Sequence, residues 1–363
     1  MKRVLRVLVV AATLSAVIVA PAAATPKEPA GLQEQLDGIV AAGAVGALVE
    51  VRDGQRVWRT TSGVAERDTT RPVPAHGRFR VGSITKTFVA TVVLQLVDEG
   101  RLRLDDSVEK VLPGVVPNGD RITVRHLLNH TSGLYDYKRT LPMPTDPAFL
   151  ADRYRTWTAT ELIQRALAHP PGPHPPGTVF DYSNTNYILL GQIIERATGR
   201  SYGTEIKRRV IWPLRLRDTA VPGTSPWIRG PHPHGYLPTQ QGLVDFTEMN
   251  PSLFGAGGEL ISTTRDLNRF VAALLDGRLV PPRLLDEMKT PGDERRKYGL
   301  GLAWLDTSCG IRLYGNDGDA LAYQAWSFST EDGRRQISVA LTPNHTADLD
   351  DAVEALLDKA ACG

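Results

Sequence analysis

A serine and a lysine three residues apart open one of the most apolar segments of the chain. Ser83 and Lys86 stand at the start of a segment that continues from Phe88 to Leu94 without a charge. If this segment is a helix, residues three apart share one face, and the ammonium group lies beside the hydroxyl. Free backbone N–H groups and the helix dipole favour negative charge in the first turn. A lysine carried inward by an apolar helix loses its proton more easily, so Lys86 could act as a base toward Ser83.

A second polar cluster, Tyr182-Ser183-Asn184, follows a proline-rich loop and precedes a segment with helical periodicity. A tyrosine near a lysine can have its phenolic pKa lowered and can then carry protons between nucleophile and leaving group. The Asn184 amide can donate to a substrate carbonyl. A Ser or Asn at this place also caps a helix, and one loop can do both.

The elements that must position these residues come from both ends of the chain. A helix over 31–41 is expected before two antiparallel strands, 44–52 and 56–60, around the Asp53-Gly54 turn. Further strands are expected over 299–305, 310–314, 322–329 and 336–341, before a closing helix over 349–360. Between the ends, helices are expected over 122–128, 159–168 and 186–197. The pattern predicts an α/β fold, with an antiparallel sheet built from both termini and flanked by helices, and an inserted mainly helical domain.

The expected domain limits follow from this pattern. Residues 25–105 and 255–363 would form the discontinuous α/β domain, and residues 106–254 the inserted helical domain. Residues 1–24 read as a signal peptide, because a basic start precedes an apolar run and small residues end at Ala24. The mature protein is therefore expected to be secreted, without a membrane anchor, and to be a monomer.

Two cysteines and a nearly neutral charge narrow the class of protein further. In an exported protein, Cys309 and Cys362 are expected to form one disulfide. The formal net charge is +2, and no basic tract interleaved with aromatic residues was found, so a nucleic acid partner is not expected.

Several motifs in the same order resemble the serine β-lactamase and penicillin-binding protein superfamily. These are 83–86, 182–184, the block Ile122 to Leu134, the segment 257–263 with Asp266 and Phe270, and Tyr298-Gly299-Leu300-Gly301. The similarity is greatest to the class C β-lactamase-like branch, which includes secreted D-Ala-D-Ala carboxypeptidases of actinomycetes.

The resemblance implies a role for each matching residue. Ser83 would be the acylated nucleophile, Lys86 its base or proton relay, and Tyr182 the general acid/base. Asn184 would position the substrate amide. The oxyanion hole would use the backbone N–H of Ser83 and one from an edge strand at the third motif. Substrates of this family are small peptides, esters or β-lactams, including peptidoglycan stem peptides, and no cofactor is implied.

The third motif departs from the family pattern. Relatives carry Lys-Thr-Gly or His-Thr-Gly where this chain has Asn316-Asp317-Gly318-Asp319, and the preceding strand lacks the arginine that holds a terminal carboxylate. Losing a charge-assisted hydrogen bond to the substrate carboxylate costs about 1.5–3 kcal/mol of binding free energy, and repulsion by an aspartate adds to this cost. Recognition of a C-terminal D-Ala carboxylate should therefore be poor, whereas a neutral ester, an amide or a cationic amine would suit the two aspartates better.

The sequence gives less support for a metal enzyme or for a Ser-His-Asp hydrolase. His126 and His130 have the i, i+4 spacing of a metal site, but Leu127 replaces the zincin glutamate, and neither His232 nor His234 supplies an evident third ligand. No Gly-x-Ser-x-Gly elbow points to a Ser-His-Asp hydrolase. These motifs favour a D-alanyl-D-alanine carboxypeptidase-like serine hydrolase, with an esterase, a D-amino-acid amidase or a non-catalytic penicillin-binding-like pseudoenzyme as alternatives.

Overall fold

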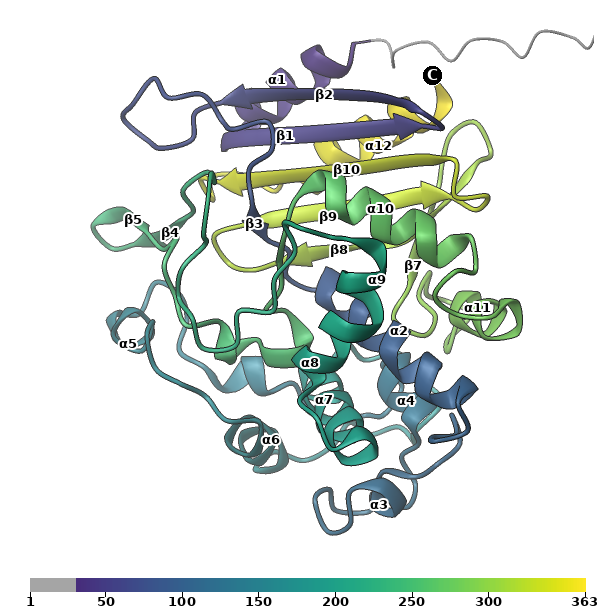
Figure 1. Cartoon of the computed structure of the whole chain (residues 1–363). Coiled ribbons are helices and arrows are strands. Elements are labelled where there is room, and N and C mark those ends of the chain that lie inside the picture. The colour runs from purple at the N-terminus through teal and green to yellow at the C-terminus, as the bar shows by residue number, and fades with distance from the viewer. Residues whose placement is uncertain (1–30) are drawn as a thin grey trace, which may run out of the picture.

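A six-stranded antiparallel sheet forms the upper half of the protein in Figure 1. The computed structural model describes residues 31–363, so the expected signal peptide lies outside the described residues. The strand order is β2 (Arg56–Gly63), β1 (Ala44–Asp53), β10 (Arg335–Pro343), β9 (Gln324–Thr330), β8 (Arg312–Asp319) and β7 (Ala303–Asp306). The first strand of the chain thus pairs with the last, with Val49 opposite Val339. The predicted α/β fold, with its sheet built from both termini, is confirmed.

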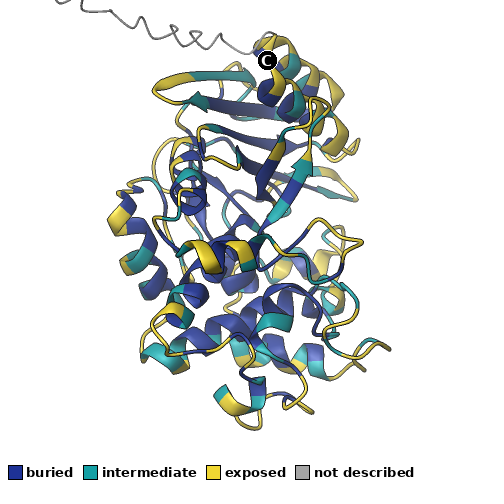
Figure 2. Ribbon diagram, turned by 90° about the vertical axis from the view of Figure 1, so that its right-hand side faces the viewer, coloured by how far each residue is buried: buried dark blue, intermediate teal, exposed yellow. Residues whose placement is uncertain are grey.

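Helices cover both faces of this sheet. Alternate residues of a strand point to opposite faces, and Val49 packs toward α1 (Leu32–Ala42) and α12 (Asp350–Cys362), whereas Leu48 belongs to the core on the other side. That other face is covered by α10 (Thr264–Leu275), which lies across the sheet in Figure 1. Buried residues run through the centre of the molecule from this sheet into the helical part below it (Figure 2).

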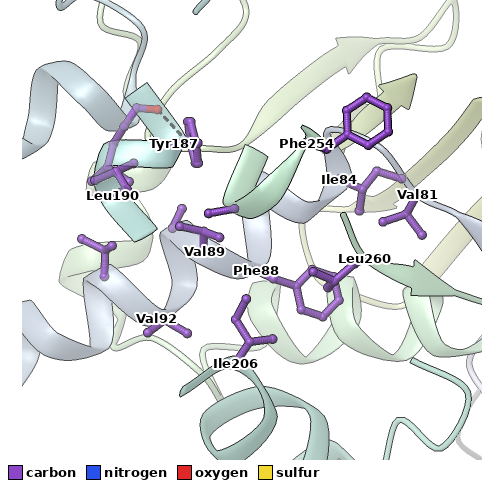
Figure 3. Packing of buried hydrophobic residues seen from close by; sticks show 14 of the residues in the cluster. Val81, Ile84, Phe88, Val89, Val92, Tyr187, Leu190, Ile206, Phe254 and Leu260 are labelled. Atoms are coloured by element: carbon purple, nitrogen blue, oxygen red, sulfur yellow. Dashed lines mark hydrogen bonds between the residues drawn. The ribbon is translucent and has the colours of Figure 1, made fainter. Parts of the chain in front are cut away.

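The helix α2 (Ile84–Asp98) is the centre of the larger core. It is buried along most of its length, because α7 (Asn184–Thr198) and α8 (Tyr202–Ile206) flank it from the helical part while β8 approaches from the sheet. Figure 3 shows Phe88, Val89 and Val92 of α2 packed among side chains of these neighbours. The Phe88 ring also stacks on Phe270 of α10, with ring centroids 3.7 Å apart. Burial on nearly every side explains why this segment reads as a continuous apolar run.

The remaining elements are short and surround this core. In the helical part they are α3 (Val108–Val111), α4 (Val124–Leu128), η1 (Tyr137–Thr140), α5 (Pro147–Ala151), α6 (Ala159–Leu167), η2 (Lys207–Ile211) and α9 (Trp212–Leu214). Two small two-stranded sheets are also present: β3 (Phe79–Arg80) pairs with β6 (Ile261–Ser262), and β4 (Tyr236–Thr239) pairs with β5 (Gly242–Asp245). The others are η3 (Pro251–Leu253), η4 (Gly255–Gly257) and α11 (Pro282–Lys289). Within residues 31–363, no helix has the length and apolarity needed to cross a bilayer. The division at residues 105 and 255 stays a prediction.

The strand expected over 299–305 is shorter than predicted. β7 begins only at Ala303, because residues 298–302 form a tight turn closed by a hydrogen bond from the Gly299 N–H to the Leu302 carbonyl at 2.8 Å. Gly301 has φ +74° in this turn, in the left-handed region that favours glycine. The apolar residues at 300 and 302 are buried in the turn, which is why the sequence looks like a strand.

The predicted disulfide is present between Cys309 and Cys362. It joins the β7–β8 turn to the end of α12 and closes a loop with a sequence separation of 53. We expect the Cys309→Ser/Cys362→Ser double variant to lose about 4 kcal/mol of unfolding free energy, because the cross-link restricts the unfolded chain. Urea unfolding of both proteins under non-reducing conditions measures this difference. Equal midpoints with equal slopes would contradict it.

Candidate active site

Ser83 and Lys86 meet at the N-terminus of α2, as the spacing predicts. Ser83 is the N-cap residue of the helix, but its side chain makes no capping hydrogen bond. Its Oγ lies 3.0 Å from Lys86 Nζ. Ser83 is partly exposed, whereas the Lys86 side chain is completely buried. A reachable hydroxyl therefore contacts an amine that water does not reach.

Two further acceptors hold the Lys86 amine. Its Nζ lies 2.8 Å from Asn184 Oδ1 and 2.6 Å from the Gly257 carbonyl oxygen. Burial lowers the pKa of Lys86 to about 7, and the positive charge of Lys138 adds to this effect. A neutral amine has two N–H donors and one lone pair. Since both donors are used by carbonyl oxygens, the lone pair is left for the Ser83 hydroxyl.

Tyr182 lies on the other side of the nucleophile, with its Oη 2.6 Å from Ser83 Oγ. The expectation that a nearby lysine lowers its pKa is wrong: burial raises the pKa of Tyr182 well above 10. The buried Lys86 is itself easily neutralised, and an uncharged amine gives no stabilisation to a phenolate. Tyr182 is therefore a protonated phenol that can donate to Ser83 Oγ. The ammonium form of Lys86 donates to Ser83 Oγ, whereas the neutral amine can accept the Ser83 proton.

Asp136 completes this network and was not predicted. Asn184 Nδ2 donates to Asp136 Oδ2 at 2.9 Å, and the carboxylate also accepts the Lys138 backbone N–H at 3.0 Å. This contact fixes the Asn184 amide so that its oxygen faces Lys86. One N–H of Asn184 remains for a substrate carbonyl, and that predicted role stays a prediction. The only signal in the sequence was the position of Asp136, two residues after the block that ends at Leu134.

The end of β8 passes unusually close to the nucleophile. A Cβ atom on Gly318 would lie 2.7 Å from the Ser83 backbone nitrogen and would also overlap the Val81 carbonyl. On the facing segment, a Cβ on Gly82 would lie 2.6 Å from the backbone nitrogen of Asp319. Two facing glycines let the two backbone segments approach closely, and the Ser83 and Asp319 backbone N–H groups both belong to this contact. These are the two groups expected to form the oxyanion hole.

The side chains of the third motif point in two directions. Asn316 is buried, and its amide donates to Thr87 Oγ1 of α2 at 3.2 Å, so it links β8 to the nucleophile helix. Asp317 and Asp319 are exposed. Enclosure by protein atoms still raises the pKa of Asp317, and its charge interacts with Lys86 and Tyr182. All four residues predicted to bind substrate on β8 lie in this segment, but their contact with substrate stays a prediction.

Of the histidines considered for a metal site, His232 and His234 stack with ring centroids 5.8 Å apart, and His130 packs on Tyr182. The His126 ring belongs to the capping box of α4 with Thr123, and His232 contacts the Gly230 carbonyl. Among the described residues, no group of three or more His, Cys, Asp and Glu side chains is arranged to hold a metal ion.

The pKa of Lys86 predicts how activity changes with pH. If the neutral amine is the base, as predicted, kcat/KM should rise as Lys86 loses its proton, with a midpoint at about pH 7. Tyr182 stays protonated below pH 10, so it should cause no decline on the alkaline side. Initial rates with a non-titrating substrate between pH 5 and 9.5 test this. A rate that falls as the pH rises through 7 would contradict the assignment of the base.

The chain is similar to several known proteins. The model of the family described as Beta-lactamase matches residues 32–361. Penicillin-binding protein 4 of Amycolatopsis lactamdurans is 32% identical over 263 residues, which cover 70% of this chain and 66% of that protein. The chain thus spans just under two thirds of the length of this relative.

Two solved structures match over nearly their whole length. A D-stereospecific amidohydrolase from Streptomyces sp. is 40% identical with a TM-score of 0.84, and the match covers 91% of this chain and 98% of that one. The D-amino acid amidase from Ochrobactrum anthropi SV3, solved with L-phenylalanine amide, is 28% identical with a TM-score of 0.79. That match covers 91% of this chain and 96% of the other.

Proposed function

Because the chain belongs to the Beta-lactamase family, we propose that it is a serine amidohydrolase that cleaves amides of D-amino acids through an acyl-enzyme on Ser83. The observation that carries this proposal is the acidic end of β8, where Asp317 and Asp319 are exposed. Two carboxylates repel a substrate whose leaving group ends in a carboxylate, but they accept a neutral amide or a cationic amine. The likeness to a D-stereospecific amidohydrolase and a D-amino acid amidase supports the same class of substrate.

The proposed reaction uses the hydrogen bonds of the site in order. Lys86 takes the Ser83 proton as Oγ attacks the carbonyl carbon, and the N–H groups of Ser83 and Asp319 stabilise the oxyanion. The phenol of Tyr182 protonates the departing nitrogen, and the proton held by Lys86 then restores the phenol. Water, with its proton taken by the same groups, releases the D-amino acid from Ser83. One amide and one water thus become one acid and one amine.

Carboxypeptidase activity, the first expectation from the resemblance, is less well supported. The arginine nearest in sequence to the third motif is Arg312, which is ion-paired with Asp306 at 2.6 Å. It stands at the opposite end of β8 from Asp319. The region from 302 to 305 contains no arginine. A terminal carboxylate would therefore meet Asp317 without a compensating cation from these strands.

A panel of substrates tests the proposed activity. D-phenylalanine amide should be hydrolysed with release of ammonia, and L-phenylalanine amide should be hydrolysed at least about tenfold more slowly. An N-acyl-D-Ala-D-Ala peptide with a free carboxylate should be the poorest substrate of the three. Faster release of D-alanine from the peptide than of ammonia from the amide would overturn the proposal in favour of a carboxypeptidase.

Removing the charge of Asp317 should change the preference for the leaving group. We expect Asp317→Asn to raise kcat/KM for the D-Ala-D-Ala peptide about tenfold, since like-charge repulsion of 1.5 kcal/mol or so is lost. Hydrolysis of the neutral amide should change less than threefold. The Asn316→His/Asp317→Thr double variant, which restores a family-like motif, should raise peptide hydrolysis further.

Asp332→Asn is the matched control for this experiment, because Asp332 is an exposed acid in the turn between β9 and β10. It removes the same charge without touching the third motif and should leave both rates unchanged. If Asp317→Asn also leaves the ratio of peptide to amide hydrolysis unchanged, the acidic end of β8 does not select the leaving group.

The place where the protein acts is part of the proposal. The disulfide between Cys309 and Cys362 supports an extracellular location, because such bonds persist in oxidising compartments. The proposed enzyme is a secreted monomer that needs no cofactor, and its substrates are small amides of D-amino acids.

A further inference from the structure

His130 has an unusual backbone conformation next to the proposed catalytic residues. Its φ is +58°, in the left-handed region that few residues other than glycine adopt. Its side chain is completely buried. A strained backbone persists only where the surroundings hold it, and such residues cluster at functional sites. The proposed mechanism makes no use of this residue.

The hydrogen bonds of His130 define its tautomer. Its Nδ1 lies 3.3 Å from the Ser183 backbone nitrogen and 3.2 Å from Asn186 Nδ2. The Asn186 amide is oriented by Ser132, whose hydroxyl donates to Oδ1 at 2.6 Å. Two donors therefore point at Nδ1, so Nδ1 is the acceptor and the ring proton is on Nε2. Burial also holds the pKa of His130 well below 6.5, which keeps the ring neutral.

The His130 ring packs directly against the phenol that contacts the nucleophile. The ring centroids of His130 and Tyr182 are 4.2 Å apart, and those of Tyr187 and Tyr298 lie 5.3 and 5.2 Å from His130. Lys86 Nζ lies 4.9 Å from the centroid of Tyr182 and 5.5 Å from that of Tyr187. His130 and Lys86 therefore both lie close to the rings of Tyr182 and Tyr187.

We propose that His130 is a positioning residue for acyl transfer, which holds the Tyr182 hydroxyl against Ser83 and helps to keep water away from Lys86. The inference rests on the proposed acyl-enzyme on Ser83. This position requires both an aromatic ring that packs on Tyr182 and an acceptor for the Ser183 N–H and the Asn186 amide. A phenylalanine would keep the ring contact but leave the Ser183 N–H and the Asn186 amide unsatisfied, whereas an asparagine would accept a hydrogen bond but leave a gap beside Tyr182.

The effect on pH follows from the environment of Lys86. The charged and titratable groups that face its amine, beside His130, are Asp136, Lys138, Tyr182, Tyr187 and Asp317. None of these is removed when His130 is replaced. Water entering the space left by the ring would restore part of the solvation of the ammonium form, and the midpoint of the rate profile would move above pH 7.

The test uses His130→Gly, because glycine adopts a positive φ without strain. Per titrated active site, kcat should fall about 100-fold with KM changed less than threefold, and the midpoint should move upward by at least half a pH unit. Added imidazole should occupy the space of the ring, raise kcat at least tenfold and return the midpoint toward 7. His130→Phe should keep the midpoint nearer to that of the wild type.

His169→Ala is the matched control, because His169 stacks on Tyr135 at 4.4 Å but is exposed. This variant should leave kcat per titrated active site and the midpoint of the pH profile unchanged. If His130→Gly only lowers the unfolding midpoint, with kcat per site and the pH midpoint unchanged, the residue is structural and the proposal is wrong. A ¹⁵N spectrum showing the proton on Nδ1, or titration of His130 between pH 5 and 9, would also overturn it.

A second readout separates this inference from the proposed substrate. The rate of covalent labelling of Ser83 by a fluorophosphonate does not depend on which amide is hydrolysed. It should fall in His130→Gly and recover with imidazole. If the wild type is labelled but does not hydrolyse D-amino-acid amides, the proposed function fails while the labelling rates still test His130. Labelling of His130→Gly at the wild-type rate and pH midpoint would overturn the inference alone.

Discussion

Ser83→Ala is expected to abolish covalent labelling and to lower kcat/KM by at least about 10³-fold, because the acyl-enzyme cannot form without the hydroxyl. Ser83 makes no capping hydrogen bond to α2, so the helix should keep its stability. Intact-protein mass spectrometry with a fluorescent penicillin and with a fluorophosphonate measures labelling, and ammonia release from a D-amino-acid amide measures turnover.

The control is Ser62→Ala, which removes the hydroxyl that contacts Asp37 at 2.6 Å on an exposed part of β2. It should leave labelling and turnover unchanged. Label that survives in Ser83→Ala would place the nucleophile elsewhere. A wild type that is labelled once and never turns over would favour the alternative of a non-catalytic penicillin-binding-like protein.

Lys86→Met is expected to lower kcat/KM by about 10³-fold or more, because methionine fills a similar volume but cannot accept the Ser83 proton. The same variant should change how stability depends on pH. Lys86 has a pKa of about 7 in the folded protein and 10.5 in the unfolded chain. Between these values the unfolded chain binds a proton that the folded protein does not, so wild-type stability should rise as the pH increases from 7 to 10.5.

Methionine cannot take part in this proton linkage. The stability of Lys86→Met relative to the wild type should therefore be roughly 3 kcal/mol greater at pH 7 than at pH 9.5. Urea unfolding of the two proteins at both pH values gives this double difference, in which other titrating groups cancel. A difference that does not change with pH would mean that Lys86 is not desolvated in the folded protein, and the base would then need another explanation.

Local sequence patterns were sufficient to predict the parts of the site that lie on one element. The three-residue spacing of Ser83 and Lys86 fixes their relation as soon as α2 forms, and the β1–β2 hairpin follows from its Asp53-Gly54 turn. The segment from Asn316 to Asp319 lies beyond the strand expected over 310–314 and was assigned to the site by the family resemblance, and it forms the end of β8. In each case one helix or strand determines the geometry.

Contacts between distant segments could not be predicted in this way. The Gly257 carbonyl reaches Lys86, and Asp136 reaches Asn184, only because η4 and the segment before η1 fold against α2 and α7. The predicted direction of the Tyr182 pKa shift was wrong, because a motif shows that a tyrosine and a lysine are close together but does not show that both are buried. The turn before β7 was predicted to be a strand, because a buried turn and a buried strand can have the same pattern of apolar residues.

The pairing of β1 with β10 has a consequence for how the protein is made. Ala44 pairs with Pro343, so two adjacent interior strands of the sheet come from distant parts of the polypeptide. At a synthesis rate of 5–20 residues per second, the hairpin of β1 and β2 would wait roughly 15 to 60 s for its partner. During that time it has an unpaired apolar edge, which is a substrate for chaperones. A product ending before Arg335 would carry Ser83, Lys86 and Tyr182 but lack the strand that joins β1 to β9.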